Sequence, residues 1–451
     1  MKLSHITLAA CAALAGGNAM ALSAAATQAV PPANRLYISG SSALQSVIEG
    51  LLNPQNCVAG TYNRYKGLAG SPAGSGDTNS GSSHNAYSCT IKTGSDIPSF
   101  DGQDIVIIKR EAGGSVQGVF PLLAGAAPIA MIDLASCTDS GANAFTCNAT
   151  ANVTPQAGVS DLEPAAFTYT VNQPSAFLNA TLPSSPFRSS SSVAEQVFAL
   201  IVSDTLFNDL STLQGTATPS VGSSAFASLF ATGYDAQNLG WTPLGKTLPG
   251  ATNQVNVCSR GIGSGTRATA QIEFLQLPYN PAAPSVATPT DNTPGSIRQG
   301  NIANTKFYSE ESSSGQVVSC VGGTAGYAIG IVGADRDLSN TGAHFVNLDN
   351  QVPGRATAKE GNYPWVFESF YQVNKNNVAS TSTSLLANAF LTAFRKPANI
   401  NAVTPAAANG VMATPVNCSG TTAIGWTGDE LAACSRVSRN KDSRLPLDFV
   451  K

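Results

Sequence analysis

The chain has 451 residues, and only 11% of them are charged, with 24 lysines and arginines against 27 aspartates and glutamates. A typical globular domain is about 25% charged. The absence of a basic excess or a basic run excludes the usual composition of a nucleic-acid-binding protein. The apolar share of 43% supports a folded core and excludes a charged disordered chain. The length predicts two or three domains, or one unit with two lobes.

Residues 1–29 have the pattern of a secretory signal peptide. An alanine-rich apolar stretch at 6–15 precedes the small-residue cleavage pattern Ala19-Met20-Ala21, and Ala24-Ala25-Ala26 is a second option. The apolar stretch is too short to span a bilayer. A lipoprotein signal ending at Cys11 is the alternative. We therefore expect an exported protein, periplasmic or secreted, that does not span the membrane.

Eight of the nine cysteines follow the predicted signal peptide, an even number that suits disulfides in an exported protein. The sequence does not fix their connectivity. We expect neighbours along the chain to pair, which gives Cys57–Cys89, Cys137–Cys147, Cys258–Cys320 and Cys418–Cys434. No Cys-x-x-Cys spacing occurs, which argues against zinc, and we expect neither a metal nor a cofactor.

Strand-like and helix-like segments alternate along the chain, which predicts an α/β architecture with mostly parallel sheets. The predicted strands are 35–40, 103–110, 127–134, 254–258, 317–320, 327–332 and 367–373. The predicted helices are 43–52, 193–210, 224–232, 266–277 and 383–394. Residues 53–100 are expected to form loops.

Two predicted strand–turn–helix junctions combine glycine with small hydroxyl residues: Ser39-Gly40-Ser41-Ser42-Ala43 and the segment 259–266, which reads SRGIGSGT. The unpaired N–H groups and the dipole at a helix N-terminus favour an anion. In the second junction Arg260 adds a planar guanidinium that suits tetrahedral oxyanions. Helix capping by the hydroxyls, with no ligand, is the alternative at both.

Lys109 and Arg110 end a predicted buried strand, where ligands often bind to open α/β sheets. They add positive potential there, unless they are simply solvated charges. A third segment, Gly240–Thr247, satisfies the phosphate-loop pattern, but the Leu248-Pro249-Gly250 that follows cannot start the required helix. We find no catalytic motif, so the chain is not expected to be an enzyme.

In their order along the chain, these segments resemble the periplasmic phosphate-binding proteins of phosphate ABC transporters, which are class-II solute-binding proteins. Residues 38–43 look like the family's first phosphate loop, and 104–110 like its D-I-x-x-S-S-R or D-x-G-x-S-D strand. Residues 227–245 are similar to its L-x-x-I-F-x-G…W-x-x-L-G segment. Arg260–Thr266 matches its R-x-x-G-S-G-T anion loop, and 326–332 is similar to its G-x-I-G-Y-V strand.

The resemblance implies a type II periplasmic-binding-protein fold, with two mostly parallel α/β lobes joined by a two-strand hinge. The crossings would lie near 127–134 and 363–373. Lobe one would then hold 35–130 and 370–451, and lobe two 131–365. Closure of the lobes would aim helix N-termini at one ligand in the cleft.

The resemblance also implies a ligand set drawn from both lobes: Ser41, Ser42, Ala43, Arg110, Arg260, Ser264, Gly265 and Thr266. The ligand would be phosphate or a similar oxyanion, the protein a monomer, and an ABC permease its partner. Many members of the family have an aspartate at the position of Lys109, which accepts the proton of hydrogen phosphate, and Glu111 is the substitute we consider here.

Two other functions stay open. The low charge, the polar insertions and the eight cysteines also suit a secreted or cell-surface protein that reuses this fold for adhesion or another extracellular role. A phosphatase is the third option, although the sequence shows neither a metal cluster nor an evident base.

Overall fold

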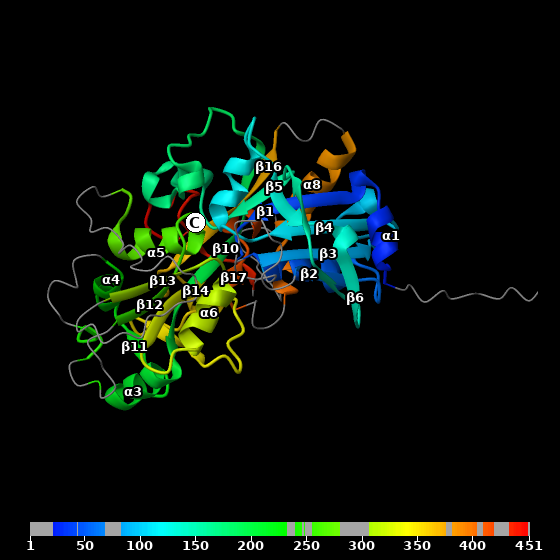
Figure 1. The fold of residues 1–451 in the computed structure, drawn as a ribbon. Coiled ribbons are helices and arrows are strands. Elements are labelled where there is room, and N and C mark those ends of the chain that lie inside the picture. Colours follow the sequence, from blue (N-terminus) through cyan, green and yellow to red (C-terminus); the bar gives the residue numbers. More distant parts are fainter. Residues whose placement is uncertain are drawn as a thin grey trace, which may run out of the picture.

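The computed structural model describes residues 21–42, 44–67, 83–231, 240–245, 248, 255–279, 306–375, 381–403, 409–418 and 433–449. Within them the chain has the expected two-lobed α/β fold. One continuous 15-stranded sheet runs through both lobes (Figure 1). Parallel ladders form the centre of each lobe, and antiparallel strands join and extend them.

Lobe one is built around strand β1 (Arg35–Gly40), which pairs in parallel with β4 (Asp104–Arg110) on one side and β9 (Ala157–Ser160) on the other. Beyond β4 the sheet continues through β3 (His84–Thr90), β2 (Asn63–Gly67), β7 (Ala144–Cys147) and β6 (Cys137–Gly141). Strands β5 (Ile129–Ile132) and β8 (Thr150–Val153) pair antiparallel in a separate two-stranded sheet. The helices of this half are α1 (Ala24–Ala29), α2 (Gln45–Gly50), α8 (Thr381–Phe394), α9 (Pro397–Asn401) and α11 (Pro415–Cys418).

Lobe two is built around strand β12 (Val255–Arg260), which pairs in parallel with β13 (Lys306–Glu311) and β14 (Ala328–Gly333). Two further strands, β15 (Ala343–Leu348) and β11 (Ser220–Val221), pair with each other. The helices of this half are α3 (Asp204–Gln214), α4 (Ser223–Phe230), α5 (Gly265–Leu275), α6 (Ser314–Gly322) and α7 (Arg355–Ala358).

Two antiparallel strands connect the lobes. Strand β10 (Phe187–Ser203) pairs with β16 (Val366–Asn374) along its first part and with β14 and β15 at its end. Strand β16 also pairs with β9, so it belongs to the sheet of lobe one. Two further pairs of short strands lie near the C-terminal end of the described residues: β17 (Val411–Met412) pairs with β10, and β18 (Val437–Ser438) pairs with β19 (Asp448–Phe449).

The strand pairings favour a different position for the first crossing between the lobes. Residues 127–134 contain β5, which pairs with β8 outside the large sheet, and β6, β7 and β9 belong to the sheet of lobe one, so the first strand that reaches lobe two is β10. We therefore propose moving the first lobe boundary from residue 131 to β10. The predicted helix 193–210 was wrong as far as Ser203, because this part of the chain is the end of strand β10. Every residue from Val193 to Ser203 is buried. An apolar run of this kind is equally typical of a buried helix and of a strand covered on both faces.

Two other predicted elements were wrong. Residues 317–320 lie in helix α6, where valines suggested a strand, but the capping box of Ser313 and Gln316 starts a helix. The expected loop at 53–100 contains β2 and β3, which pair with each other and extend the sheet of lobe one. Tertiary pairing decided both cases, because these segments are too short for a strong periodic signal.

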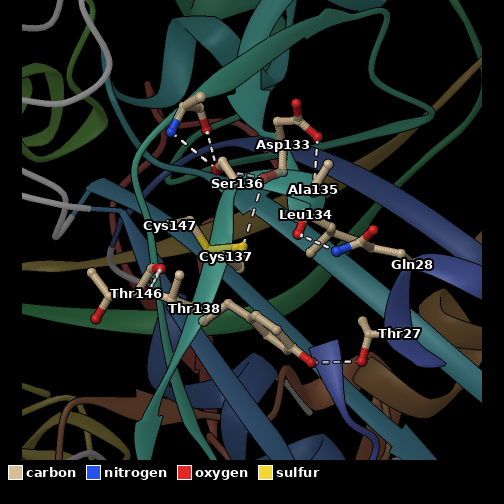
Figure 2. The surroundings of a disulfide bond; sticks show 12 residues. Thr27, Gln28, Asp133, Leu134, Ala135, Ser136, Cys137, Thr138, Thr146 and Cys147 are labelled. Carbon is tan, nitrogen blue, oxygen red and sulfur yellow. Dashed lines mark hydrogen bonds between the residues drawn. A yellow bond between two sulfur atoms is a disulfide. The ribbon is translucent and has the colours of Figure 1, made fainter. Parts of the chain in front are cut away.

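The predicted disulfides are confirmed at all four positions: Cys57–Cys89, Cys137–Cys147, Cys258–Cys320 and Cys418–Cys434. Figure 2 shows the bond between Cys137 and Cys147, which are direct partners across β6 and β7. Beside it Gln28 donates a hydrogen bond to the carbonyl of Leu134 at 3.2 Å. The segment around α1 therefore packs on the body of lobe one, although it falls within the predicted signal peptide.

The apolar interior is continuous between the lobes. The core cluster of lobe two includes residues of α4, α5 and β14, and it also takes in Val116, Phe120 and Phe167 from segments that flank β9. A second cluster fills lobe one between β1, β16 and α8. The lobes thus meet through packed side chains beside the strands that connect them.

Candidate functional site

The loop that follows β1 is held against β9. Gly40 has a φ of 110°, and a side chain there would overlap the carbonyl oxygen of Val159, so this position requires glycine. The N–H of Ser41 donates to that same carbonyl at 2.9 Å. The side chains of Ser41 and Ser42 are both buried. Ala43 lies outside the described residues.

Arg260 ends strand β12 in the interior between the lobes and is only 2% exposed. Its Nη1 donates to the hydroxyls of Ser42 at 3.3 Å and Ser314 at 3.0 Å. Its Nε and Nη2 donate to the carbonyls of Glu311 and Ser312 at 3.2 and 3.0 Å. Burial lowers the pKa of Arg260 to about 10, which leaves the guanidinium charged at neutral pH. A fixed cation therefore bridges the two lobes.

The N-terminus of α5 faces the same interior. Ser264 is its N-cap and accepts a hydrogen bond from the N–H of Arg267 at 3.4 Å. Gly265 and Thr266 occupy the first helical positions, whose N–H groups have no acceptor within a helix. Within the described part of the chain, the buried hydroxyl of Thr266 has no hydrogen-bond partner. These groups could all donate to an anion.

Asp161 is the site residue that sequence reasoning missed. It follows β9 directly, is 2% exposed, and accepts a hydrogen bond from the hydroxyl of Ser41. A Cβ added to Gly265 would lie 2.5 Å from its Oδ2 and closer still to the hydroxyl of Ser115, so only glycine fits at the start of α5. Burial raises the pKa of Asp161, against the lowering by its hydroxyl partners and by Arg260.

A sequence signal for Asp161 existed. The segment 158–161 reads Gly-Val-Ser-Asp, which fits the end of the pattern D-x-G-x-S-D. We matched that pattern to 104–110, where the last residues are Lys109 and Arg110. In the structure β9 and β4 flank β1 on opposite sides, and β9 is the strand nearer to β16. The carboxylate therefore comes from β9.

Lys109 has a structural position. Its buried ammonium donates to three carbonyls, those of Gly40 and Ser41 at 2.9 Å and that of Arg110 at 3.0 Å. Burial lowers its pKa to about 8, and burial likewise raises the pKa of Glu111 to about 7. Lys109 thus fixes the loop after β1 rather than facing a ligand.

Two hydrogen bonds of Arg110 lead away from this cluster. Its Nη1 donates to the carbonyl of Ala130 at 2.9 Å, and its Nε to that of Ala112 at 3.4 Å. Arg110 lines a different pocket, beside the paired strands β5 and β8. We therefore leave Arg110 out of the proposed ligand set.

The lobes contact each other around the cluster. The N–H of Val116 donates to the carbonyl of Gly263 at 2.9 Å, and the guanidinium of Arg336 donates to the carbonyl of Ser42 at 2.8 Å. A pocket of about 270 Å³ opens beside Arg260 and Ser264, with Glu310 and Glu311 also on its wall. The described arrangement is therefore closed around the cluster, with a small pocket next to it.

In the part of the chain that the structure describes, no group of three or more His, Cys, Asp or Glu side chains could hold a metal ion. No helix in these described ranges is long and apolar enough to cross a bilayer. The false phosphate loop forms a turn at Gly240–Gly245, and its Lys246 and Thr247 lie outside the described residues.

No protein-family model matches the chain, and no curated protein matches it. Among solved structures it is similar to phosphate-binding proteins of ABC transporters. A substrate-binding protein of a phosphate ABC transporter from Clostridium perfringens, with bound phosphate, is 14% identical, with a TM-score of 0.40 over 79% of this chain and 93% of that one. An ABC-type phosphate transport receptor from Vibrio cholerae is 10% identical, with a TM-score of 0.36 over 79% and 93%. A phosphate-binding protein from Stenotrophomonas maltophilia is 12% identical, with a TM-score of 0.37 over 79% and 84%.

Proposed function

We propose that the chain binds an oxyanion, with inorganic phosphate as the ligand, between its two lobes. One observation carries the proposal. A buried guanidinium and a buried carboxylate lie at the N-terminus of α5, where the lobes touch, and the first turn of that helix carries a buried hydroxyl that has no hydrogen-bond partner among the described residues; these are Arg260, Asp161 and Thr266. The ligand set is Ser41, Ser42, Asp161, Arg260, Ser264, Gly265 and Thr266.

Each part of the set has a separate role. Arg260 supplies the fixed positive charge, and its planar fork suits two oxygens of a tetrahedral anion. The N–H groups of Gly265 and Thr266 and the hydroxyls supply neutral donors that need little reorganisation. Because the site is buried, each of these interactions is stronger than it would be in water.

Asp161 is the basis for choosing phosphate over sulfate. Hydrogen phosphate carries a proton that a carboxylate can accept, whereas sulfate has none at neutral pH and would meet the carboxylate as a like charge. Glu111, the carboxylate that the sequence suggested as the acceptor of the phosphate proton, lies beside Lys109 instead. Asp161 fills the role better because it contacts Ser41 and approaches the start of α5.

The proposal includes capture for transport. The ligand would bind with the lobes apart, and closure about β10 and β16 would bring Arg260 and α5 against the loop after β1. Release to an ABC permease would reverse this step. The protein would act as a monomer in the periplasm or outside the cell, where its disulfides are stable.

Export is part of this proposal, with one refinement of the cleavage site. Residues 1–20 lie outside the described residues, but Thr27 is fully buried and its hydroxyl lies 2.6 Å from that of Tyr65. Cleavage after Ala21 would keep this packing, whereas cleavage after Ala26 would cut α1. We therefore expect the mature chain to begin at Leu22, which sequencing of the N-terminus checks.

Calorimetry on phosphate-free protein tests the proposal. Phosphate, arsenate and sulfate are titrated into the parent, into Arg260→Gln, and into Arg436→Gln, which removes an exposed arginine that is paired with Glu360. We expect binding of phosphate and arsenate by the parent and by the Arg436 variant, and its loss in the Arg260 variant. A folded parent that binds none of the three anions would contradict the proposal and favour the alternative extracellular role.

A further inference from the structure

A pocket of about 820 Å³ lies in lobe two, between the loop that follows β14, the start of β15 and helix α7. Its volume is within the roughly 300–1,000 Å³ typical of small-molecule sites. The wall includes the polar side chains of Ser339, Asn340 and Asn409 beside the apolar ones of Leu338 and Phe345. Because the wall is mixed, the charged side chains decide what kind of ligand the pocket suits.

The charges of this pocket are unbalanced. Among the described residues that line it, three cations accompany a single carboxylate: Arg336, Arg355 and Lys359 against Asp337. The imidazole of His344 also lines the pocket, and its Nε2 contacts the carboxylate of Asp204. Only 24 of the 451 residues are lysine or arginine. Repulsion between like charges disfavours such a cluster unless an anion neutralises it.

Two of the cations have donors that the fold leaves unused. Within the described part of the chain, the ammonium of Lys359 has neither an ion pair nor a hydrogen bond. Arg336 donates from Nη2 to the carbonyl of Ser42 at 2.8 Å, while its buried Nε has no hydrogen-bond partner in the same residues. Both side chains can therefore take an anionic partner without giving up an existing one.

Arg355 supplies a cation that is fixed in position. It donates from Nε to the carbonyl of Val411 at 2.8 Å, from Nη1 to the side chain of Asn401 at 3.0 Å and from Nη2 to the carbonyl of Ile400 at 3.3 Å. A guanidinium carries five N–H groups, so these bonds do not exhaust its donors. Burial lowers the pKa of Arg355 to about 10, which leaves it charged at neutral pH.

We propose that this pocket binds a small polyanion, a molecule with two or more separated acidic groups such as a polycarboxylate or a condensed phosphate. A single exposed ion pair contributes little to affinity, because water and salt screen it. Several acidic groups on one molecule can engage the three cations together, and once one group is bound the others bind at high effective concentration. Guanidinium and ammonium groups accept carboxylates and phosphates alike.

The inference does not depend on the proposed function, because none of the three cations belongs to the ligand set of the first site. Lys359 is the residue to change, since its side chain has no partner to lose, whereas Arg336 and Arg355 also hold parts of the fold together. Lys92 is a matched control: it is also partly buried, and it lies in lobe one outside the pocket. Lys359→Glu and Lys92→Glu change the net charge equally.

Calorimetry on the complete protein, in phosphate-free buffer of low ionic strength, compares citrate and tripolyphosphate with acetate. We expect saturable binding of at least one polyanion by the parent and by the Lys92 variant. The Lys359 variant should bind it at least about fivefold more weakly, because one attraction becomes a repulsion. Acetate should not saturate the pocket in the same concentration range. Tighter binding of citrate would assign the pocket to polycarboxylates, and tighter binding of tripolyphosphate to condensed phosphates.

One further variant separates the two sites. Arg260→Gln should leave polyanion binding unchanged, and Lys359→Glu should leave phosphate binding at the first site unchanged. Absence of saturable binding of both polyanions, equal affinities of the two lysine variants, or an affinity for acetate equal to that for the polyanions would overturn the proposal. Loss of polyanion binding in the Arg260 variant would overturn it as well, because the polyanion would then occupy the first site.

Discussion

Replacement of Asp161 by asparagine is the sharpest test of the proposed ligand. The change keeps the shape of the side chain and the oxygen that accepts from Ser41, but it removes the negative charge and replaces one acceptor with a donor. Because burial raises the pKa of Asp161, ionisation of this carboxyl costs the folded state free energy. The asparagine variant should therefore be at least as stable as the parent.

The expected effect on affinity follows from the acceptor role. A hydrogen bond to a charged group contributes about 1.5–3 kcal/mol, so phosphate should bind roughly 10- to 150-fold more weakly. Sulfate should bind more tightly, because it no longer meets a like charge and gains a donor. The ratio of the two affinities should thus fall by more than the roughly 10- to 150-fold loss expected for phosphate alone.

Calorimetric titration of both anions at pH 7.5 measures this ratio, with Thr266→Val as the control. The hydroxyl of Thr266 has no hydrogen-bond partner among the described residues, so this variant removes a neutral donor without changing the contacts of Asp161 and should weaken both anions alike, by about fivefold. If the asparagine variant keeps the parent's ratio of phosphate to sulfate affinity, Asp161 does not accept a proton from the ligand and the reasoning fails.

Three other predictions concern the site and the fold. Gly265→Ala should weaken phosphate binding by at least about tenfold, because its Cβ overlaps the carboxylate of Asp161 and the hydroxyl of Ser115. Gly261→Ala is the control and should bind phosphate normally, because its Cβ meets no atom nearer than 4.0 Å. Equal phosphate affinities of the two variants would count against the site. Burial lowers the pKa of His84 from 6.5 to about 4, so the unfolded chain binds more protons between these values. The free energy of unfolding should therefore fall by about 3 kcal/mol as the pH drops from 7 to 4, and His84→Gln should remove this share in urea titrations; an unchanged pH dependence would refute it. Replacement of both Cys258 and Cys320 by serine removes the disulfide that closes a loop with a sequence separation of 62. The free energy of unfolding in urea should fall by about 4 kcal/mol, because the unfolded chain is then less constrained. A fall of less than about 1 kcal/mol would contradict this expectation.

Local patterns predicted the elements that have strong local signals. Strands β1, β4 and β14 and helices α4, α5 and α8 lie within a few residues of their predicted bounds. The predictions failed at β10 and α6, where the apolar residues fit either structure. Strand β10 is a strand because β14, β15 and β16 pair with it, and none of those pairings can be read from the segment itself.

The candidate site was only partly visible in the sequence. The loop from Arg260 to Thr266 combines glycine, hydroxyl and arginine within seven residues, so its chemistry could be read locally. Asp161 could not be assigned with the same ease, because its role depends on β9 lying beside β1, 120 residues earlier in the chain. Arg110 ends a strand near the site, but its hydrogen bonds to the carbonyls of Ala112 and Ala130 lie outside the cluster, and we therefore propose a ligand set without it.

The sequence by itself determined the low charge, the even set of cysteines, the α/β class, and the two glycine-rich loops. These features depend on composition and on residues close along the chain. The tertiary structure alone decided where the chain crosses between lobes, which strand supplies the carboxylate, and which cation faces the candidate site. Those outcomes depend on strand order and on the burial of side chains between distant segments, because hydrogen bonding and desolvation act between groups that folding brings together.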